Sequence, residues 1–168
     1  VSEEEKARRE RAREGGQGIV SYSVDAAGRR VVFTINGQLF LTEINEDGTG
    51  GVTREVALAD PQLSVIMPRI SPDGQLIAYT TGSEVRVIAL GADASQDEDW
   101  AVIGIDEDEC TYPDQSVGLA EFVAGEEMDR YEGFWWSPDS RALLVQSTAE
   151  EPGPVWYMSD PADPPKPA

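Results

Sequence analysis

The amino-acid sequence predicts an all-β fold: a partial β-propeller of about three blades of antiparallel strands, with a short helical insertion and a charged N-terminal helix. Two observations predict this class. First, one pattern occurs three times: a turn of the Ser-Pro-Asp-Gly type, a short apolar strand, a tight hairpin turn and a second alternating strand. Second, the units start at Ser23, Ser71 and Ser137, which lie 48 and 66 residues apart. A propeller blade of four strands needs a period of roughly 40–50 residues.

The first element is a charged helical arm at residues 1–16. Ser2 and Glu5 form a capping box, and Glu4 lies four residues before Arg8, in the orientation that favours an ion pair. Because this helix has almost no apolar face, we expect a solvated arm; a docking helix for a partner subunit or domain is the alternative. Residues 17–168 follow as the propeller fragment.

Within the fragment, blade-like repeats lie near residues 19–60, 61–100 and 132–160, and the longer second interval leaves room for a helical insertion at residues 101–131. The proline-rich tail, residues 152–168, is expected to be an extended connector. Propellers typically close with about 4–8 blades, so three blades leave strand edges bare. We therefore expect the isolated chain either to self-associate or to be marginally stable.

The composition excludes several classes of function. Histidine is absent and no G-x-S-x-G segment is present, so the chain contains no Ser-His-Asp triad and we assign it no catalytic residue. The net charge of −19 argues against a nucleic-acid partner. No apolar run is long enough to span a membrane, and no signal peptide is visible. The single cysteine, Cys110, has no disulfide partner in the chain, and we expect a cytoplasmic, bacterial protein.

Neither a metal nor a cofactor is expected. Zinc sites need imidazoles or paired cysteines, which the sequence lacks. The acidic runs at residues 97–99 and 106–109 lack the glycine and the alternate-ligand spacing of a calcium loop, and are interpreted as solvated loops at a blade edge. Acids and bases balance in residues 1–14, so the whole acidic excess follows them and would attract cationic ligands such as free amines.

The insertion contains the candidate site. Leu119, Phe122 and Val123 form an i, i+3, i+4 apolar stripe on a predicted helix, and the next position on that stripe is Glu126. A carboxylate on an apolar face is costly unless a cation or a donor meets it, and repulsion from the adjacent Glu127 adds to that cost. A bound ammonium would offset both the cost of the carboxylate on the apolar face and the repulsion between the two carboxylates. The alternative is that the two glutamates point to solvent or form ion pairs with Arg130, which follows Glu126 by four residues.

This segment carries a family resemblance. The run Glu126-Glu127-Met128-Asp129-Arg130-Tyr131, followed by Gly133-Phe134-Trp135-Trp136-Ser137-Pro138, resembles the double-glutamate segment of the dipeptidyl peptidase IV family of prolyl-oligopeptidase-like serine peptidases. The similarity is greatest with the cytosolic and bacterial branches, and it spans roughly residues 17–165. In that family the paired glutamates bind the protonated N-terminus of a peptide, which implies this role for Glu126 and Glu127. Arg130 is interpreted as the residue that holds them in place.

The resemblance implies a function. The chain would be the substrate-recognition propeller portion of a serine dipeptidyl aminopeptidase that releases N-terminal dipeptides, usually with proline second, from peptides with a free N-terminus. The α/β-hydrolase domain with the triad would lie downstream, outside this chain. The alternative is a non-catalytic Ser-Pro-Asp-Gly-repeat propeller that acts as a scaffold for protein–protein interaction, which should tolerate the loss of both glutamates.

Overall fold

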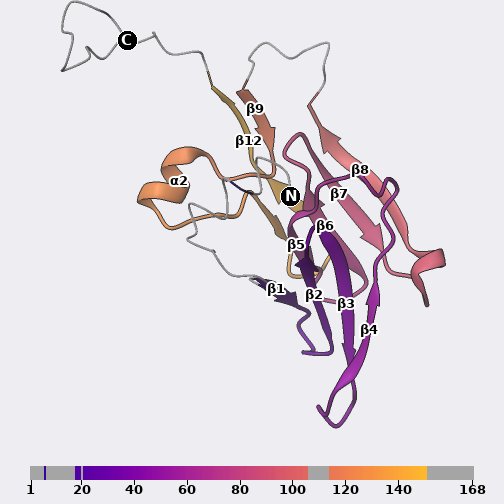
Figure 1. The fold of residues 1–168 in the computed structure, drawn as a ribbon. Coiled ribbons are helices and arrows are strands. Elements are labelled where there is room, and N and C mark those ends of the chain that lie inside the picture. Colours follow the sequence, from indigo (N-terminus) through magenta and orange to yellow (C-terminus); the bar gives the residue numbers. More distant parts are fainter. Residues whose placement is uncertain (1–5, 7–17, 20, 106–113, 151–168) are drawn as a thin grey trace, which may run out of the picture.

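The computed structural model describes residues 6, 18, 19, 21–105 and 114–150 (Figure 1). Several predicted features lie outside these residues. They are the N-terminal arm apart from Lys6, the acidic run at 106–109, and the chain after residue 150, which includes the second strand of the third repeat and the proline-rich tail.

Two sheets contain four antiparallel strands each, paired in sequence order (Figure 1). The first sheet comprises β1 (Tyr22–Val24), β2 (Arg30–Ile35), β3 (Gln38–Ile44) and β4 (Gly51–Glu55). The second comprises β5 (Ile66–Ile70), β6 (Leu76–Thr80), β7 (Glu84–Ala89) and β8 (Glu98–Gly104), with the short 3-10 helix η1 (Ala94–Gln96) before β8. An antiparallel four-stranded meander is the form of a propeller blade.

The remaining strands form two short antiparallel ladders. One joins β10 (Phe134–Trp136) to β11 (Leu143–Val145), and the other joins β12 (Ser147–Glu150) to β9 (Asp114–Val117). The helix α2 (Phe122–Glu127) lies between β9 and β10 in the chain. This arrangement confirms the predicted all-β fold, a partial propeller with a short helix inserted. No helix within the described residues is long and apolar enough to cross a membrane.

Each repeat begins with the same tight turn, in which the fourth residue's backbone N–H donates to the first residue's carbonyl oxygen. The three bonds run from Gly28 to Asp25 (3.1 Å), from Gly74 to Ser71 (2.9 Å) and from Ser140 to Ser137 (2.9 Å). The fourth residue has a positive φ in all three turns, 68°, 74° and 62°, which explains why glycine occupies it twice. The first turn therefore starts at Asp25, two residues after the serine from which the spacing was counted.

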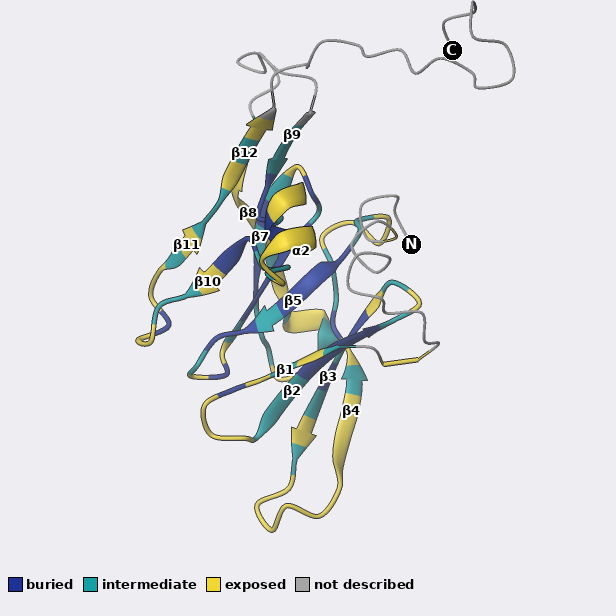
Figure 2. Ribbon diagram, turned by 90° about the vertical axis from the view of Figure 1, so that its left-hand side faces the viewer, coloured by how far each residue is buried: buried dark blue, intermediate teal, exposed yellow. Residues whose placement is uncertain are grey.

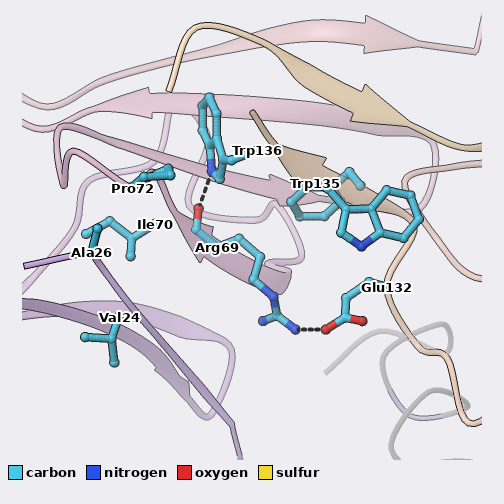
Figure 3. A pocket seen from close by; sticks show the side chains of 9 residues that line it. Val24, Ala26, Arg69, Ile70, Pro72, Glu132, Trp135 and Trp136 are labelled. Atoms are coloured by element: carbon cyan, nitrogen blue, oxygen red, sulfur yellow. Dashed lines mark hydrogen bonds and ion pairs between the residues drawn. The ribbon is translucent and has the colours of Figure 1, made fainter. Parts of the chain in front are cut away.

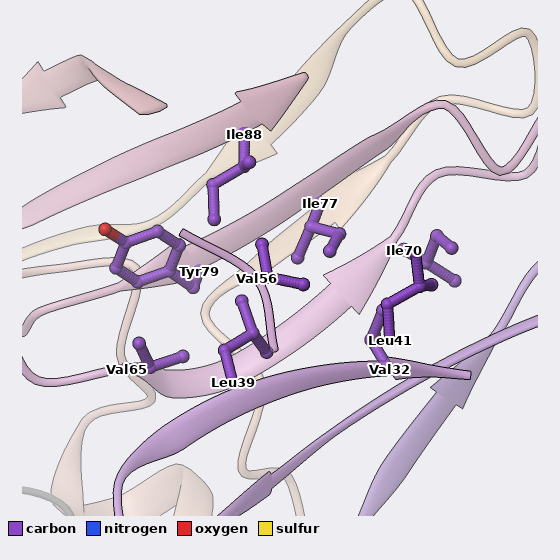
Figure 4. Packing of buried hydrophobic residues seen from close by; sticks show 9 residues of the cluster. All are labelled: Val32, Leu39, Leu41, Val56, Val65, Ile70, Ile77, Tyr79 and Ile88. Atoms are coloured by element: carbon purple, nitrogen blue, oxygen red, sulfur yellow. The ribbon is translucent and has the colours of Figure 1, made fainter. Parts of the chain in front are cut away.

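The strands β5, β6 and β7 of the second sheet have buried side chains on both faces, since successive side chains of a strand point to opposite sides. Ile77 and Tyr79 belong to one core and Ala78, between them, belongs to the other. The first core lies between the two four-stranded sheets (Figure 4) and contains Val32, Leu39, Leu41, Val56, Val65, Ile70, Ile77, Tyr79 and Ile88. The second core packs the same sheet against β9 and β10 and contains Ile66, Met67, Ala78, Val85, Val87, Val117 and Phe134. The sheets thus stack face to face, as propeller blades do.

The interpretation of residues 97–99 as a solvated loop is wrong. The Asp97 side chain is fully buried (0% exposed) and accepts hydrogen bonds from Nη1 and Nη2 of Arg54 at 2.6 and 2.9 Å. It also accepts from the backbone N–H groups of Gly91 (2.9 Å) and Ala57 (3.2 Å). Arg54 lies on β4 of the first sheet, so this carboxylate joins the two blades.

Asp99 is buried in the same way. Its side chain is 1% exposed and accepts from Nε of Arg86 at 3.0 Å and from the Tyr79 hydroxyl at 2.8 Å. The backbone N–H of Ala59, in the link between the two sheets, donates to it at 2.8 Å. Burial, together with the hydrogen bond to Asp99, raises the pKa of Tyr79, so its hydroxyl stays protonated and remains a donor.

Candidate functional site

The helix α2 is short and mostly exposed (Figure 2). Glu121 caps it: the side chain accepts hydrogen bonds from the backbone N–H groups of Val123 (2.7 Å) and Ala124 (2.9 Å). Only Ala124 and Gly125 are buried. Small residues on the inner side let the helix lie close against the propeller while its larger side chains face outward.

Glu126 and Glu127 stand at the C-terminal end of α2, and both are exposed. Neither carboxylate makes a hydrogen bond or an ion pair with any residue that the structure describes. The expectation that Glu126 continues a buried apolar stripe is wrong, because Phe122 and Val123 are 57% and 49% exposed. Within α2 the buried residues are instead Ala124 and Gly125.

Arg130 does not contact the two glutamates. Its Nη1 donates to the carbonyl oxygen of Glu132 (2.7 Å) and to Oε1 of Gln146 (2.8 Å), and its Nη2 lies 3.7 Å from Oε1 of Glu121. The guanidinium carbon also lies 5.9 Å from the ring centroid of Trp135, within the range of a cation–π contact. Arg130 therefore supports the helix that bears the glutamates rather than the carboxylates themselves.

The chain turns sharply where α2 ends. The backbone N–H groups of Met128 and Arg130 both donate to the carbonyl oxygen of Ala124, at 3.2 and 3.0 Å. Asp129 has a positive φ of 52°, and its Oδ1 accepts from the Tyr131 hydroxyl at 3.0 Å. These bonds fix the direction in which the chain leaves the helix.

The two ends of the segment that carries α2 lie against each other. Leu119 and Glu132 form an isolated antiparallel bridge. A Cβ on Gly133 would clash with the backbone of Gly118 and Leu119, and Gly118 itself has a φ of 76°. The segment between these glycines is therefore a closed loop held at its base.

Beside this loop lies an open pocket of about 330 Å³, lined by residues of β1, β5 and β10 and of the segments next to them (Figure 3). Arg69 Nη2 and Glu132 Oε1 meet there at 3.0 Å. The indole Nε1 of Trp136 donates to the Arg69 carbonyl oxygen at 3.0 Å, and Trp136 packs on the second core. Trp135 stays 37% exposed and also lines the pocket. Sequence reasoning did not identify this pocket, because its walls come from three separate repeats.

The described residues contain no group of three or more acidic, cysteine or histidine side chains that could hold a metal ion. What the site offers is two adjacent acceptor-only groups at the end of a helix. Such a pair suits a ligand with several N–H donors and a positive charge.

Comparison with known proteins gives the family. The family model described as the dipeptidyl peptidase IV (DPP IV) N-terminal region matches residues 13–167. The chain belongs to this family. The resemblance noted from the double-glutamate segment is thus confirmed at the level of the family, and the assignment of individual site residues stays a prediction.

Two curated relatives of the chain are distant in sequence. Dipeptidyl peptidase 8 of Mus musculus is 27% identical over 149 residues, which are 83% of this chain and 16% of the relative. Dipeptidyl peptidase 8 of Homo sapiens is 26% identical over 147 residues, 82% of this chain and 16% of the relative. The chain therefore spans about a sixth of the length of these curated relatives.

The fold is shared with a solved structure. The crystal structure of Porphyromonas gingivalis dipeptidyl peptidase 4 matches with a TM-score of 0.53 and 19% identity, over 89% of this chain and 21% of that chain. At this identity the match concerns the fold, which is a partial β-propeller.

Proposed function

We propose that this chain is the substrate-recognition propeller portion of a serine dipeptidyl aminopeptidase that releases N-terminal dipeptides, usually with proline second. One observation carries the proposal: in a chain of the dipeptidyl peptidase IV N-terminal family, two adjacent exposed carboxylates, Glu126 and Glu127, have no partner among the described residues. The nucleophile and its base would come from a separate hydrolase domain, since this sequence contains no histidine.

The ligand that suits the glutamate pair is the α-ammonium of a peptide. An ammonium has three N–H donors and no acceptor, and an ionised carboxylate has only acceptors. Each charge-assisted hydrogen bond is worth about 1.5–3 kcal/mol. The bound cation would also offset the repulsion between the neighbouring carboxylates, and the acidic excess of the chain would favour the approach of a cation.

An ammonium anchor makes the peptidase an exopeptidase. If Glu126 and Glu127 hold the N-terminus at a fixed distance from the serine, only the bond after the second residue reaches the nucleophile. A blocked N-terminus would lose the anchor and leave the two carboxylates without a cation. We therefore expect strong discrimination between free and acetylated substrates.

The test is kinetic and uses the complete enzyme that carries this chain. We would measure kcat/KM on an Xaa-Pro chromogenic amide, free and N-acetylated, for the wild type and for Glu126→Gln/Glu127→Gln. Loss of both charges should lower kcat/KM on the free amide by about 100-fold, the effect of about 2.7 kcal/mol. Glu98→Gln is the matched control, because Glu98 is an exposed glutamate on β8, far along the chain from α2.

The wild type should hardly turn over the acetylated amide. Equal rates on the free and blocked amides, or a double variant with wild-type kcat/KM, would refute the ammonium anchor. No turnover of either amide by the complete wild-type protein would instead favour the scaffold.

A further inference from the structure

We propose that Gln146 and Glu121 are positioning residues for the glutamate pair and act through Arg130, which ties α2 to the point where β11 passes into β12. The inference rests on the proposed function, because it concerns how the propeller holds Glu126 and Glu127 toward a substrate amine. It names two residues that no sequence pattern indicated.

Arg130 is the centre of the network. Its side chain is 32% exposed, so most of the side-chain surface is covered by the protein. Nη1 donates to the carbonyl oxygen of Glu132 and to Oε1 of Gln146, while Nη2 faces Oε1 of Glu121. A guanidinium holds its donors in a rigid plane, so these acceptors together fix both the position and the rotation of the group.

Gln146 is held from both sides by the backbone. Its N–H donates to the Gly133 carbonyl oxygen, and its carbonyl oxygen accepts from the Gly118 N–H, both at 2.8 Å. Its side-chain Nε2 donates to Oγ1 of Thr148 at 3.1 Å. The amide is therefore oriented, and Oε1 is left to accept from Arg130. Gln146 is bonded to both glycines at the base of the loop that carries α2.

Glu121 links Arg130 to the helix. The Glu121 carboxylate accepts hydrogen bonds from the backbone N–H groups of Val123 and Ala124 in the first turn, and it also faces Arg130. The backbone N–H of Arg130 meanwhile donates to the Ala124 carbonyl oxygen. Arg130 thus contacts α2 at its cap through the side chain and within the helix through the backbone.

The helix depends on these contacts for its orientation. A six-residue helix is not stable by itself in water, and only two of its residues are buried. Without the Gln146 side chain, Arg130 keeps its hydrogen bond to the Glu132 carbonyl oxygen but loses the acceptor that anchors it to the junction between β11 and β12. The carboxylates of Glu126 and Glu127 would then sample more directions, and the N-terminal anchor would weaken.

The test uses three single variants in the complete enzyme. Gln146→Leu removes the acceptor at similar volume, Gln146→Glu keeps an acceptor at the same place, and Gln38→Leu is the matched control on an exposed glutamine of β3. Gln146→Leu should raise KM for a free Xaa-Pro amide about tenfold, the scale on which a displaced positioning group acts, with kcat little changed. Gln146→Glu should restore the wild-type KM, and Gln38→Leu should leave it unchanged. A fall in kcat at constant KM in Gln146→Leu would mean loss of active enzyme, and would overturn the inference.

Two further measurements separate this inference from the proposed function. In the Glu126→Gln/Glu127→Gln background, Gln146→Leu should add no further rise in KM, because both changes remove the same anchor. If that double variant itself keeps the wild-type KM, the proposed function fails, and backbone hydrogen exchange of residues 122–128 decides the inference alone. Faster exchange there in Gln146→Leu, reversed in Gln146→Glu, supports the network; unchanged exchange refutes it.

Discussion

The buried carboxylate of Asp97 should be a main determinant of the contact between the first two blades. It takes four hydrogen bonds, two of them from Arg54, and no part of its side chain reaches solvent. In Asp97→Ala, the Arg54 guanidinium and the backbone N–H groups of Gly91 and Ala57 lose their acceptor. Removing one member of a buried ion pair costs about 3–5 kcal/mol. The low end, about 3 kcal/mol, applies here, because the Arg54 side chain is 21% exposed and can recover part of its hydration.

The assay is urea unfolding of the 168-residue chain, followed by tryptophan fluorescence. With a slope of about 2 kcal/mol per molar urea, a loss of about 3 kcal/mol moves the midpoint down by about 1.5 M. The control is Glu43→Ala, because Glu43 (54% exposed) pairs with Arg30 (26% exposed) at a position more open to solvent. An exposed pair of this kind contributes less than about 1 kcal/mol. If Asp97→Ala and Glu43→Ala shift the midpoint equally, the argument from burial is wrong.

The same pair gives a pH dependence of stability. Burial would raise the pKa of the Asp97 carboxyl, but hydrogen bonds from Arg54, Gly91 and Ala57 outweigh it and hold the pKa below that of an ordinary aspartate. A carboxyl with a lowered folded-state pKa contributes stability above its unfolded pKa, and that stability is lost as the pH falls through the folded pKa. The wild type should therefore lose stability as the pH falls below about 4, more steeply than Asp97→Asn does. Parallel pH profiles for the two proteins would contradict the assignment.

Three further changes test other parts of the structure. In urea unfolding, Ser140→Ala should be less stable than Ser140→Gly by about 1 kcal/mol. Both variants lose the hydrogen bond from the Asp73 N–H, but only glycine relieves the strain of the positive φ. The reverse order of stability would mean that the turn is not strained. Tyr79→Phe should cost about 1–2 kcal/mol, since it deprives the buried Asp99 carboxylate of a donor, and an unchanged midpoint would count against that bond. Gly133→Ala should speed hydrogen exchange in α2, because the alanine Cβ would clash with the backbone of Gly118 and Leu119, just after β9. Hydrogen-exchange protection equal to the wild type would show that the base of the loop can adjust.

The repeating parts of the fold could be predicted from the sequence because their signals are local. Proline, aspartate and glycine specify the turns, and alternation specifies the strands between them. At Asn36 and Gly37, for example, both φ values are positive (53° and 85°), as a two-residue hairpin requires. The family could be identified for a similar reason, since the double-glutamate segment is a continuous run.

The rest depends on contacts between distant residues, which spacing does not reveal. Asp97 and Arg54 are 43 residues apart, and only the stacking of two blades brings them together. The stripe that includes Phe122 and Val123 has helical spacing, but whether another element covers it is a property of the fold. Gln146 carries no chemical signal in the sequence, because its role comes from where the strand passes from one ladder to the next.

The most direct test of the central claim is to measure how much the substrate's ammonium contributes to binding, with and without the two glutamates. By calorimetry on the complete enzyme, we would determine Kd for an Xaa-Pro dipeptide amide and for its desamino analogue, in the wild type and in Glu126→Gln/Glu127→Gln. If the pair binds the ammonium, removing the amine should weaken binding to the wild type by about 100-fold and to the double variant by less than about threefold. An equal loss in both proteins would show that the amine is recognised elsewhere, and would contradict the account.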